Sequence, residues 1–177
     1  MASDLGKTSY VILGMLKLGR RTGYEIKSLV DVSTRFFWAA SYGQIYPELK
    51  RLAERGLIEA DAEAEGGRRR MTYRLTQAGR DAFASWIEAP ELTHEMRDEG
   101  LLKLFFAGVL GRDQAIAVLE AAREKYVQKR EALVAIEPPA EAAKRFGPLA
   151  VLSYGLGMSE FAINWCDENL EQLKERD

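Results

Sequence analysis

The clearest hydrophobic pattern of the chain lies between Ser41 and Gly56. Ile45, Leu49 and Leu52 recur at spacings of four and three residues, which is the apolar stripe of an amphipathic helix. Ser41 is placed to cap this predicted helix, and Gly56 is placed to end it. The opposite side presents small, amide, phenol and basic groups that suit a DNA groove; these residues are Gly43, Gln44, Tyr46, Pro47, Lys50 and Arg51.

Two further helices are predicted before this one. Residues 8–18 are apolar on most sides and predict a buried helix. The sequence from Thr22 to Glu25 fits a capping box, in which each residue caps the backbone near the other. It opens a helix with Ile26, Leu29 and Val30 on one face. The connector that follows holds three large aromatic residues, which we expect to pack on neighbouring helices or on a second module; they are Phe36, Phe37 and Trp38.

Two short strands are predicted after Gly56, at residues 57–61 and 71–76. Residues 62–70 between them predict a loop longer than an ordinary hairpin turn, ending in Arg68, Arg69 and Arg70. A further helix is predicted from Gln77 to about Ala89. Three helices followed by a hairpin with a basic tip is the order of a winged helix-turn-helix, whose recognition helix reads the major groove.

The second half of the chain predicts helices only. A short apolar helix spans residues 99–108, and a long one with a heptad pattern begins with Asp113 as its cap. The last helix, about 148–174, has apolar seams on two sides, of which the long helix can cover one. The N-terminal module or a second copy of the chain must cover the other, and a self-complementary dimer is favoured. The residues predicted at the dimer interface are Leu149, Leu152, Leu156, Ile163, Leu170 and Leu173, and the second seam is Val151, Tyr154, Met158, Phe161 and Trp165.

Composition and charge support a division into two modules. Residues 1–80 hold 14 lysines and arginines against 9 acidic residues, whereas residues 81–177 hold 11 against 18. A basic half joined to an acidic half indicates an anion-binding module and a module with another task. The predicted fold is mainly α with a small β-hairpin: a winged helix-turn-helix domain at 1–90 and an α-helical dimerisation domain, with a possible effector-sensing role, at 91–177.

Other classes of chemistry find little support in the sequence. The single histidine, His94, and the single cysteine, Cys166, cannot form a four-ligand zinc site within one chain. We therefore predict no metal, no cofactor, no catalytic residues and no enzymatic activity. One cysteine and the lack of a long apolar run favour a cytoplasmic protein without a transmembrane helix.

Several motifs together resemble the PadR family of bacterial transcriptional regulators. The most specific stretch is Ser41–Leu52 followed by Gly56-Leu57-Ile58. Weaker similarities lie at Thr22–Ile26, Phe37-Trp38, Tyr73–Arg80, Arg97–Phe106 and in the last helix, so that the resemblance covers nearly the whole chain, in the form of the larger subfamily with a long helical C-terminal domain. Gly100 departs from the family, which more often has an aliphatic residue there.

The resemblance implies a homodimeric repressor that binds a palindromic operator in double-stranded DNA and is released by a small aromatic or hydrophobic effector. A winged-helix module that binds proteins without DNA is the alternative. An effector cavity between the modules is expected at Phe37, Trp38, Phe105, Phe106, Tyr154 and Trp165, although the same residues can simply form core. The DNA-binding residues implied by position are Tyr24, Lys27, Ser41, Tyr42, Gln44, Tyr46, Lys50, Arg51, Arg68, Arg69 and Arg70.

Overall fold

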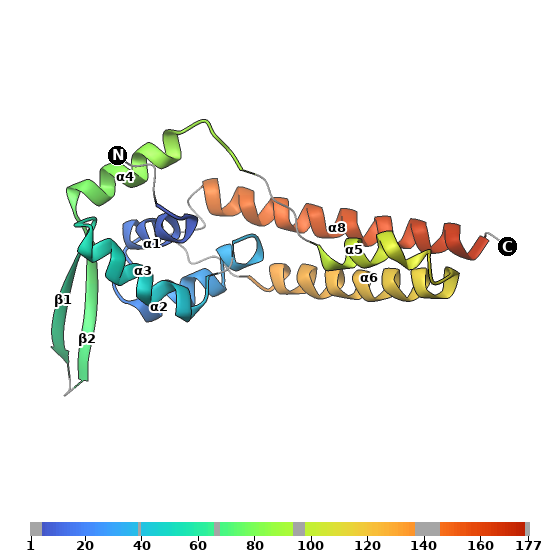
Figure 1. The fold of residues 1–177 in the computed structure, drawn as a ribbon, viewed down its shortest axis with the longest axis horizontal. Coiled ribbons are helices and arrows are strands. Elements are labelled where there is room, and N and C mark those ends of the chain that lie inside the picture. Colours follow the sequence, from blue (N-terminus) through green and yellow to red (C-terminus); the bar gives the residue numbers. More distant parts are fainter. Residues whose placement is uncertain (1–4, 39, 66–67, 94–97, 137–145, 176–177) are drawn as a thin grey trace. The chain divides into compact units, whose positions relative to one another are not determined.

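The computed structural model describes residues 5–38, 40–65, 68–93, 98–136 and 146–175 (Figure 1). Contacts between Cα atoms divide the chain into two compact units, Met1–Leu92 and Thr93–Asp177. Each unit has its own cluster of buried apolar side chains. His94 and Arg97, both named above from the sequence, lie outside the described part of the chain.

The N-terminal unit is a small helical core that carries one hairpin. Helix α3 is continuous although Pro47 lies in its interior. Ile45, Leu49 and Leu52 of α3 are fully buried, so the predicted apolar stripe is confirmed. The helices of this unit are α1 (Lys7–Lys17), α2 (Gly23–Asp31), the 3₁₀ turn η1 (Thr34–Phe36), α3 (Tyr42–Glu54) and α4 (Gln77–Glu88).

Local capping fixes where these helices begin and end. The Thr22 hydroxyl accepts the Glu25 backbone N–H at 3.2 Å, and the Glu25 carboxylate accepts the Thr22 N–H at 3.1 Å, which confirms the predicted capping box. Gly56 has φ +68° and follows Arg55, the C-cap of α3, so the left-handed conformation that glycine permits ends the helix.

The hairpin is longer than the sequence predicted. Strands β1 (Ile58–Glu65) and β2 (Arg68–Leu75) pair antiparallel, with Ile58 opposite Leu75 and Glu65 opposite Arg68. The prediction of a long loop at 62–70 is therefore wrong, because only two residues separate the strands, and Arg68, Arg69 and Arg70 belong to β2. The register places Glu59 of β1 opposite Arg74 of β2, and the ion pair between them stabilises the ladder.

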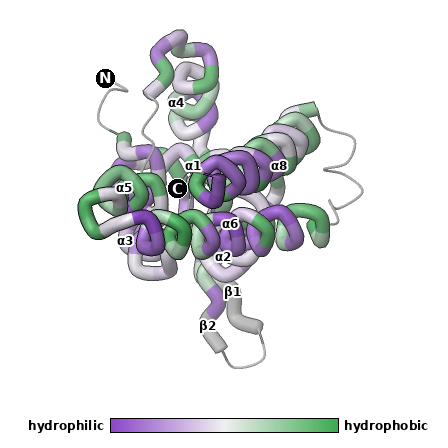
Figure 2. Tube along the Cα trace, turned by 90° about the vertical axis from the view of Figure 1, so that its right-hand side faces the viewer, coloured by the Kyte–Doolittle hydropathy of each residue, from purple (hydrophilic) through white to green (hydrophobic). Residues whose placement is uncertain are grey.

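In the described part of the C-terminal unit, two helices, α5 and α8, pack on a third, α6. Asp113 was predicted to cap α6, but Gly111, with φ +116°, is the N-cap and Asp113 lies in the first turn. Figure 2 shows that α5 is hydrophobic along much of its length. The helices are α5 (Glu99–Ala107), α6 (Arg112–Val134) and α8 (Phe146–Glu175).

The two seams of α8 have different environments within this unit. Cys166 and Leu170 are buried in a cluster with Leu119 of α6. Leu170, predicted at the dimer interface, is thus already buried inside the chain at 7% exposure, and Leu173 packs beside it. Four members of the other seam are exposed, Val151 at 44%, Tyr154 at 64%, Met158 at 43% and Phe161 at 63%, while Trp165 packs against the cluster.

Helix α8 is the one helix in the described part of the chain that is long and apolar enough to cross a membrane by length and composition. The sequence predicted no such helix. Two ion pairs join it to α6, Arg130 with Glu160 and Arg123 with Asp167. Such charged pairs are rare within a bilayer, and they support an amphipathic helix packed on α6.

Candidate nucleic-acid interface

The outer face of α3 presents two stacked tyrosines beside polar side chains. The rings of Tyr42 and Tyr46, one helical turn apart, lie 6.1 Å apart with an angle of 17° between their planes, and both are about half exposed. Lys50 extends beyond them, with its side chain 80% exposed and its Nζ atom 3.7 Å from a Glu54 oxygen. This face combines aromatic, hydroxyl and basic groups on a helix whose other face is buried, which suits reading of base edges.

Gln44 is tied to the first turn of α3. Its Oε1 atom accepts the Ser41 backbone N–H at 3.0 Å and the Ser41 hydroxyl at 3.3 Å. Gln44 therefore supplies the side-chain acceptor of the capping box at the start of α3, and its side chain stays exposed. A bidentate contact to adenine would need the Gln44 amide to exchange these bonds for bonds to the base.

The expected phosphate contacts Lys27 and Tyr24 differ in exposure. The Lys27 side chain is only 14% exposed, because its Nζ atom pairs with Asp31 and lies 5.3 Å from the centre of the Tyr42 ring. Lys27 thus positions Tyr42 by a cation–π contact. Tyr24 is 66% exposed and remains available to a partner.

A polar network joins α3 to α1 and occupies Arg51. The Nε and Nη2 atoms of Arg51 donate to the two Glu48 oxygens at 2.9 and 2.8 Å, and Nη2 also donates to the Ser9 hydroxyl at 3.2 Å. Ser9 is fully buried and its hydroxyl donates to Glu48. Arg51, predicted to contact DNA, is therefore engaged in fixing α3 on the core.

The charge of Glu48 is stabilised in this network. Burial by itself raises the pKa of the Glu48 carboxyl, but the hydrogen bonds from Arg51 and Ser9 outweigh it, so that its pKa lies below the ordinary value. Sequence reasoning missed Ser9 and Glu48, because Ser9 lies 39 residues from Glu48 and no local pattern marks a contact of that range.

The wing is attached to the turn before α2. The Tyr73 backbone N–H donates to the Arg21 carbonyl at 2.7 Å, and Nη2 of Arg70 donates to the Glu25 carboxylate at 2.9 Å. Arg68 and Arg69 are described only through the backbone of β2. The wing strand and the helix-turn-helix are thus bonded to each other directly.

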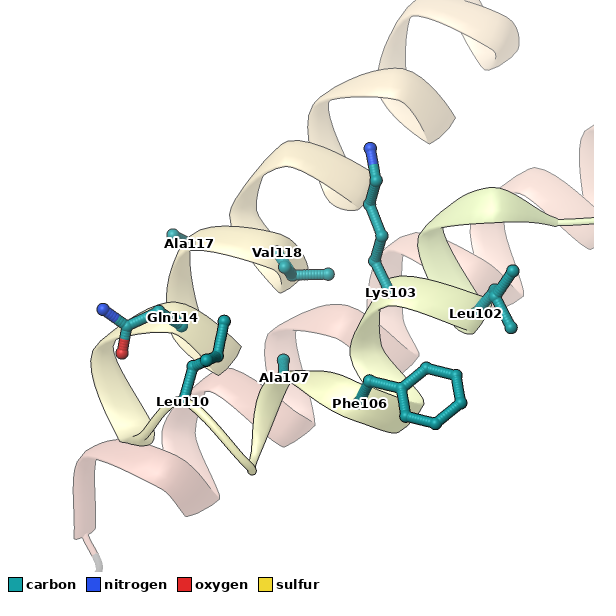
Figure 3. Close-up of a pocket in the computed structure, with 8 residues that line it drawn as sticks. All are labelled: Leu102, Lys103, Phe106, Ala107, Leu110, Gln114, Ala117 and Val118. Carbon is teal, nitrogen blue, oxygen red and sulfur yellow. The ribbon is translucent and has the colours of Figure 1, made fainter.

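An open apolar groove lies between α5 and α6 in the C-terminal unit (Figure 3). Its volume is about 570 Å³, and Lys103 at its edge pairs with Glu99 at 2.7 Å. Such a groove suits apolar side chains or an apolar ligand. The residues that line it are Leu102, Lys103, Phe106, Ala107, Leu110, Gln114, Ala117 and Val118.

The residues expected to form an effector cavity are mostly exposed within their own units. Phe37 is 58% and Trp38 41% exposed, so the helices of the N-terminal unit do not cover them, and the alternative of packing on the second module stays a prediction. Phe105 and Phe106 pack edge to face with centroids 5.0 Å apart, and Tyr154 is exposed. Trp165 packs against the core cluster of α6 and α8. A cavity between the two units stays a prediction.

Comparison with known proteins identifies relatives for both units. Residues 12–85 match the Transcriptional regulator PadR-like family, and residues 96–174 match the Virulence activator alpha C-term family. The Negative transcriptional regulator PadR of Bacillus subtilis (strain 168) is 29% identical over 93% of this chain and 96% of its own length.

Solved structures of that regulator resemble the whole chain. The Bacillus subtilis PadR structure in complex with operator DNA has a TM-score of 0.86 at 27% identity, covering 97% of this chain and 99% of that one. The structure of the same regulator with p-coumaric acid has a TM-score of 0.76 at 28% identity, covering 94% and 98%. Because both units match and the similarity runs along nearly the full length of the sequence, the chain belongs to the PadR-like family of transcriptional regulators, with a helical C-terminal unit that follows its winged helix-turn-helix in the sequence.

Proposed function

We propose that the protein is a homodimeric repressor that binds a palindromic operator through α3 and the wing and is released by a small aromatic or hydrophobic effector. The observation that carries this proposal is the exposed face of α3, with Tyr42, Gln44, Tyr46 and Lys50 held on a buried helix. The similar Bacillus subtilis regulator has been solved with operator DNA and with p-coumaric acid, which supports both the DNA partner and the class of effector.

The roles of individual residues follow from their contacts. Gln44 and the tyrosine pair read base edges, while Lys50 and Tyr24 contact the phosphate backbone. For Arg68 and Arg69 the proposal of a phosphate contact rests on the family resemblance of the sequence alone. Arg51 and Lys27 act indirectly. The guanidinium of Arg51 bonds Glu48 and holds α3 in place, and the ammonium of Lys27 pairs with Asp31 and holds Tyr42 in place.

The exposed seam of α8 is proposed as the main dimer surface. Val151, Tyr154, Met158 and Phe161 follow one another at helical spacing and are all at least 43% exposed. A contiguous apolar stripe of this kind is uncommon on a monomer, and a two-fold axis would bury it against its own copy. Leu149 is also exposed but lies on the other seam, so its place in the interface stays a prediction from the sequence, whereas Leu170 belongs to the core of its own chain.

We also propose that the protein acts in the cytoplasm and has no enzymatic activity. Its relatives are transcriptional regulators, whose DNA target lies in that compartment in bacteria. Its site is a binding surface of hydrogen-bond donors and cations rather than an arrangement of nucleophile and base.

Fluorescence anisotropy with labelled DNA tests the function. Wild-type protein should bind a selected operator far more tightly than random DNA, and both affinities should fall steeply with salt. Gln44→Ala should lower the ratio of operator to random affinity by about tenfold, the value of one good base contact. Lys129→Gln, which removes an exposed cation of the C-terminal unit, is the matched control. Equal affinity of wild type for operator and random DNA would contradict the proposal.

A further inference from the structure

A single carboxylate, that of Glu25, joins helix α2 to the wing. Its Oε2 atom accepts the backbone N–H groups of Arg21 at 2.9 Å and of Thr22 at 3.1 Å. Its Oε1 atom accepts a hydrogen bond from Nη2 of Arg70 at 2.9 Å, across 45 residues of sequence. Because two backbone amides hold Oε2, the direction of the carboxylate is fixed independently of the wing.

A second bond attaches the same strand to the same turn. The backbone N–H of Tyr73 donates to the Arg21 carbonyl at 2.7 Å, while Tyr73 lies opposite Ala60 in the hairpin register. Strand β2 is therefore bonded to β1 along one edge and to the α1–α2 turn along the other. Arg70 and Tyr73 are about 10 Å apart along an extended strand, so two separated points set the direction of the wing.

The charges around Arg70 disfavour a direct role at phosphate. Its side chain is 47% exposed, and that of Glu25, whose carboxylate accepts its hydrogen bond, is 35% exposed. A phosphate approaching Arg70 would meet the repulsion of the fixed Glu25 carboxylate. Breaking the pair would leave that carboxylate facing the DNA without its partner.

We propose that Arg70 anchors the wing and that Glu25 is a positioning residue for DNA binding, rather than Arg70 being a phosphate contact. The Glu25–Arg70 pair holds β2 on the turn before α2. Helix α3 in turn packs against α2. The wing and α3 then approach DNA as one preorganised surface, which lowers the ordering cost of binding. This inference rests on the proposed function, since it assigns roles within DNA binding.

The test compares Glu25→Gln, Arg70→Gln and the double variant, each bound to an operator selected with the wild-type protein. The glutamine side chain of the Glu25→Gln variant keeps an oxygen acceptor for the two backbone amides, so the cap of α2 is retained. Each single variant should weaken operator binding by about two- to fivefold, the value of a half-exposed ion pair. The double variant should bind no more weakly than the weaker single variant, because both changes break the same link.

The salt dependence separates an anchor from a phosphate contact. With Arg70 as an anchor, the slope of log affinity against log salt in Arg70→Gln equals that of wild type. A slope smaller by about one, or tighter DNA binding by Glu25→Gln, would overturn the inference, because Glu25 would then be competing with phosphate for Arg70.

Arg74→Gln is the matched control. Arg74 lies on the same strand but pairs with Glu59 and Asp61 of β1. This variant removes one wing arginine without touching the link to α2, so its operator affinity should stay within about twofold of wild type. A loss as large as that of Arg70→Gln would contradict the inference. Failure of the wild-type protein to bind any selected DNA would instead reject the proposed function itself.

Discussion

The aromatic ring of Tyr46 covers Gly23 so closely that a Cβ atom at Gly23 would lie 2.6 Å from Cε1 and 2.9 Å from Cζ of that ring. Gly23 opens α2, and Tyr46 lies on the outer face of α3. The contact therefore sets the position of a proposed DNA-reading side chain from a neighbouring helix. Glycine at position 23 is needed for close approach, not for an unusual backbone conformation.

Replacing Gly23 by alanine should move Tyr46 while leaving the fold intact. The ring is half exposed and can turn outward, so Gly23→Ala should shift the melting temperature by only a few degrees. Operator affinity should fall by about tenfold, because one base contact is displaced. The effect of Gly23→Ala should vanish in a Tyr46→Ala background. An equal loss in both backgrounds would show that Gly23 acts on something other than Tyr46.

Gly79, by contrast, is predicted to matter for stability. A Cβ atom there would lie 2.0 Å from the backbone carbonyl oxygen of Leu57, which cannot turn aside as a side chain can. Gly79→Ala should lower the free energy of unfolding by about 2–4 kcal/mol, measured by urea denaturation. Gly108→Ala is the control, since a Cβ atom there meets nothing within 4 Å and the backbone is right-handed helical. Similar stabilities of the two variants would contradict the role assigned to Gly79.

A charge placed on the exposed seam of α8 should prevent the protein from forming dimers. Phe161→Glu should convert dimers to monomers at micromolar concentration, because a charge would enter the proposed interface. Sedimentation equilibrium measures the mass, and circular dichroism checks that the helices persist. Leu92→Glu makes the same chemical change at a residue that is 93% exposed in the N-terminal unit, and it should stay dimeric. If the Phe161→Glu variant stayed dimeric, the exposed seam of α8 would not be the dimer interface.

The carboxyl group of Asp98, the N-cap of α5, makes the stability of the C-terminal unit depend on pH. Burial by itself raises the pKa of the Asp98 carboxyl, but hydrogen bonds from the Tyr126 hydroxyl and from the Leu101 and Gly100 amides lower it below its ordinary value of 3.8. A depressed pKa stabilises the fold fully above that ordinary value, and the stabilisation is lost as the pH falls through the lower folded-state pKa.

Asp98→Asn keeps an acceptor for these donors and removes the titration. The variant should lose less stability than wild type as the pH is lowered below 3.8, which urea denaturation at a series of pH values measures. Parallel losses in the two proteins would show that the acid sensitivity arises from other carboxyl groups.

Much of the fold could be predicted because its signals are local. The capping box at Thr22 and Glu25 and the stop at Gly56 act within one turn of helix, and both were read from residue type and spacing. The stripe of α3 likewise required only helical periodicity, and all its members are buried.

What could not be predicted depends on contacts between distant parts of the chain. By its position on α3, Arg51 was expected to contact DNA, but the fold places Ser9, 42 residues away, beside it. Periodicity marked two apolar seams on α8 but could not tell which one meets α6, since each has the same spacing. The hairpin was predicted too short, because the pairing of residues 62–65 with residues 68–71 appears only in the backbone register.

Selection of bound fragments from a random DNA pool tests the central claim most directly. A dimer with one recognition helix in each protomer should enrich an inverted repeat, with half-site centres about one helical turn, or a multiple of it, apart. Gln44→Ala, selected in parallel, should enrich the same repeat with relaxed preference at one position of each half-site. Enrichment of a single unrepeated site, or of no sequence at all, would contradict the account of this protein as a paired reader of DNA.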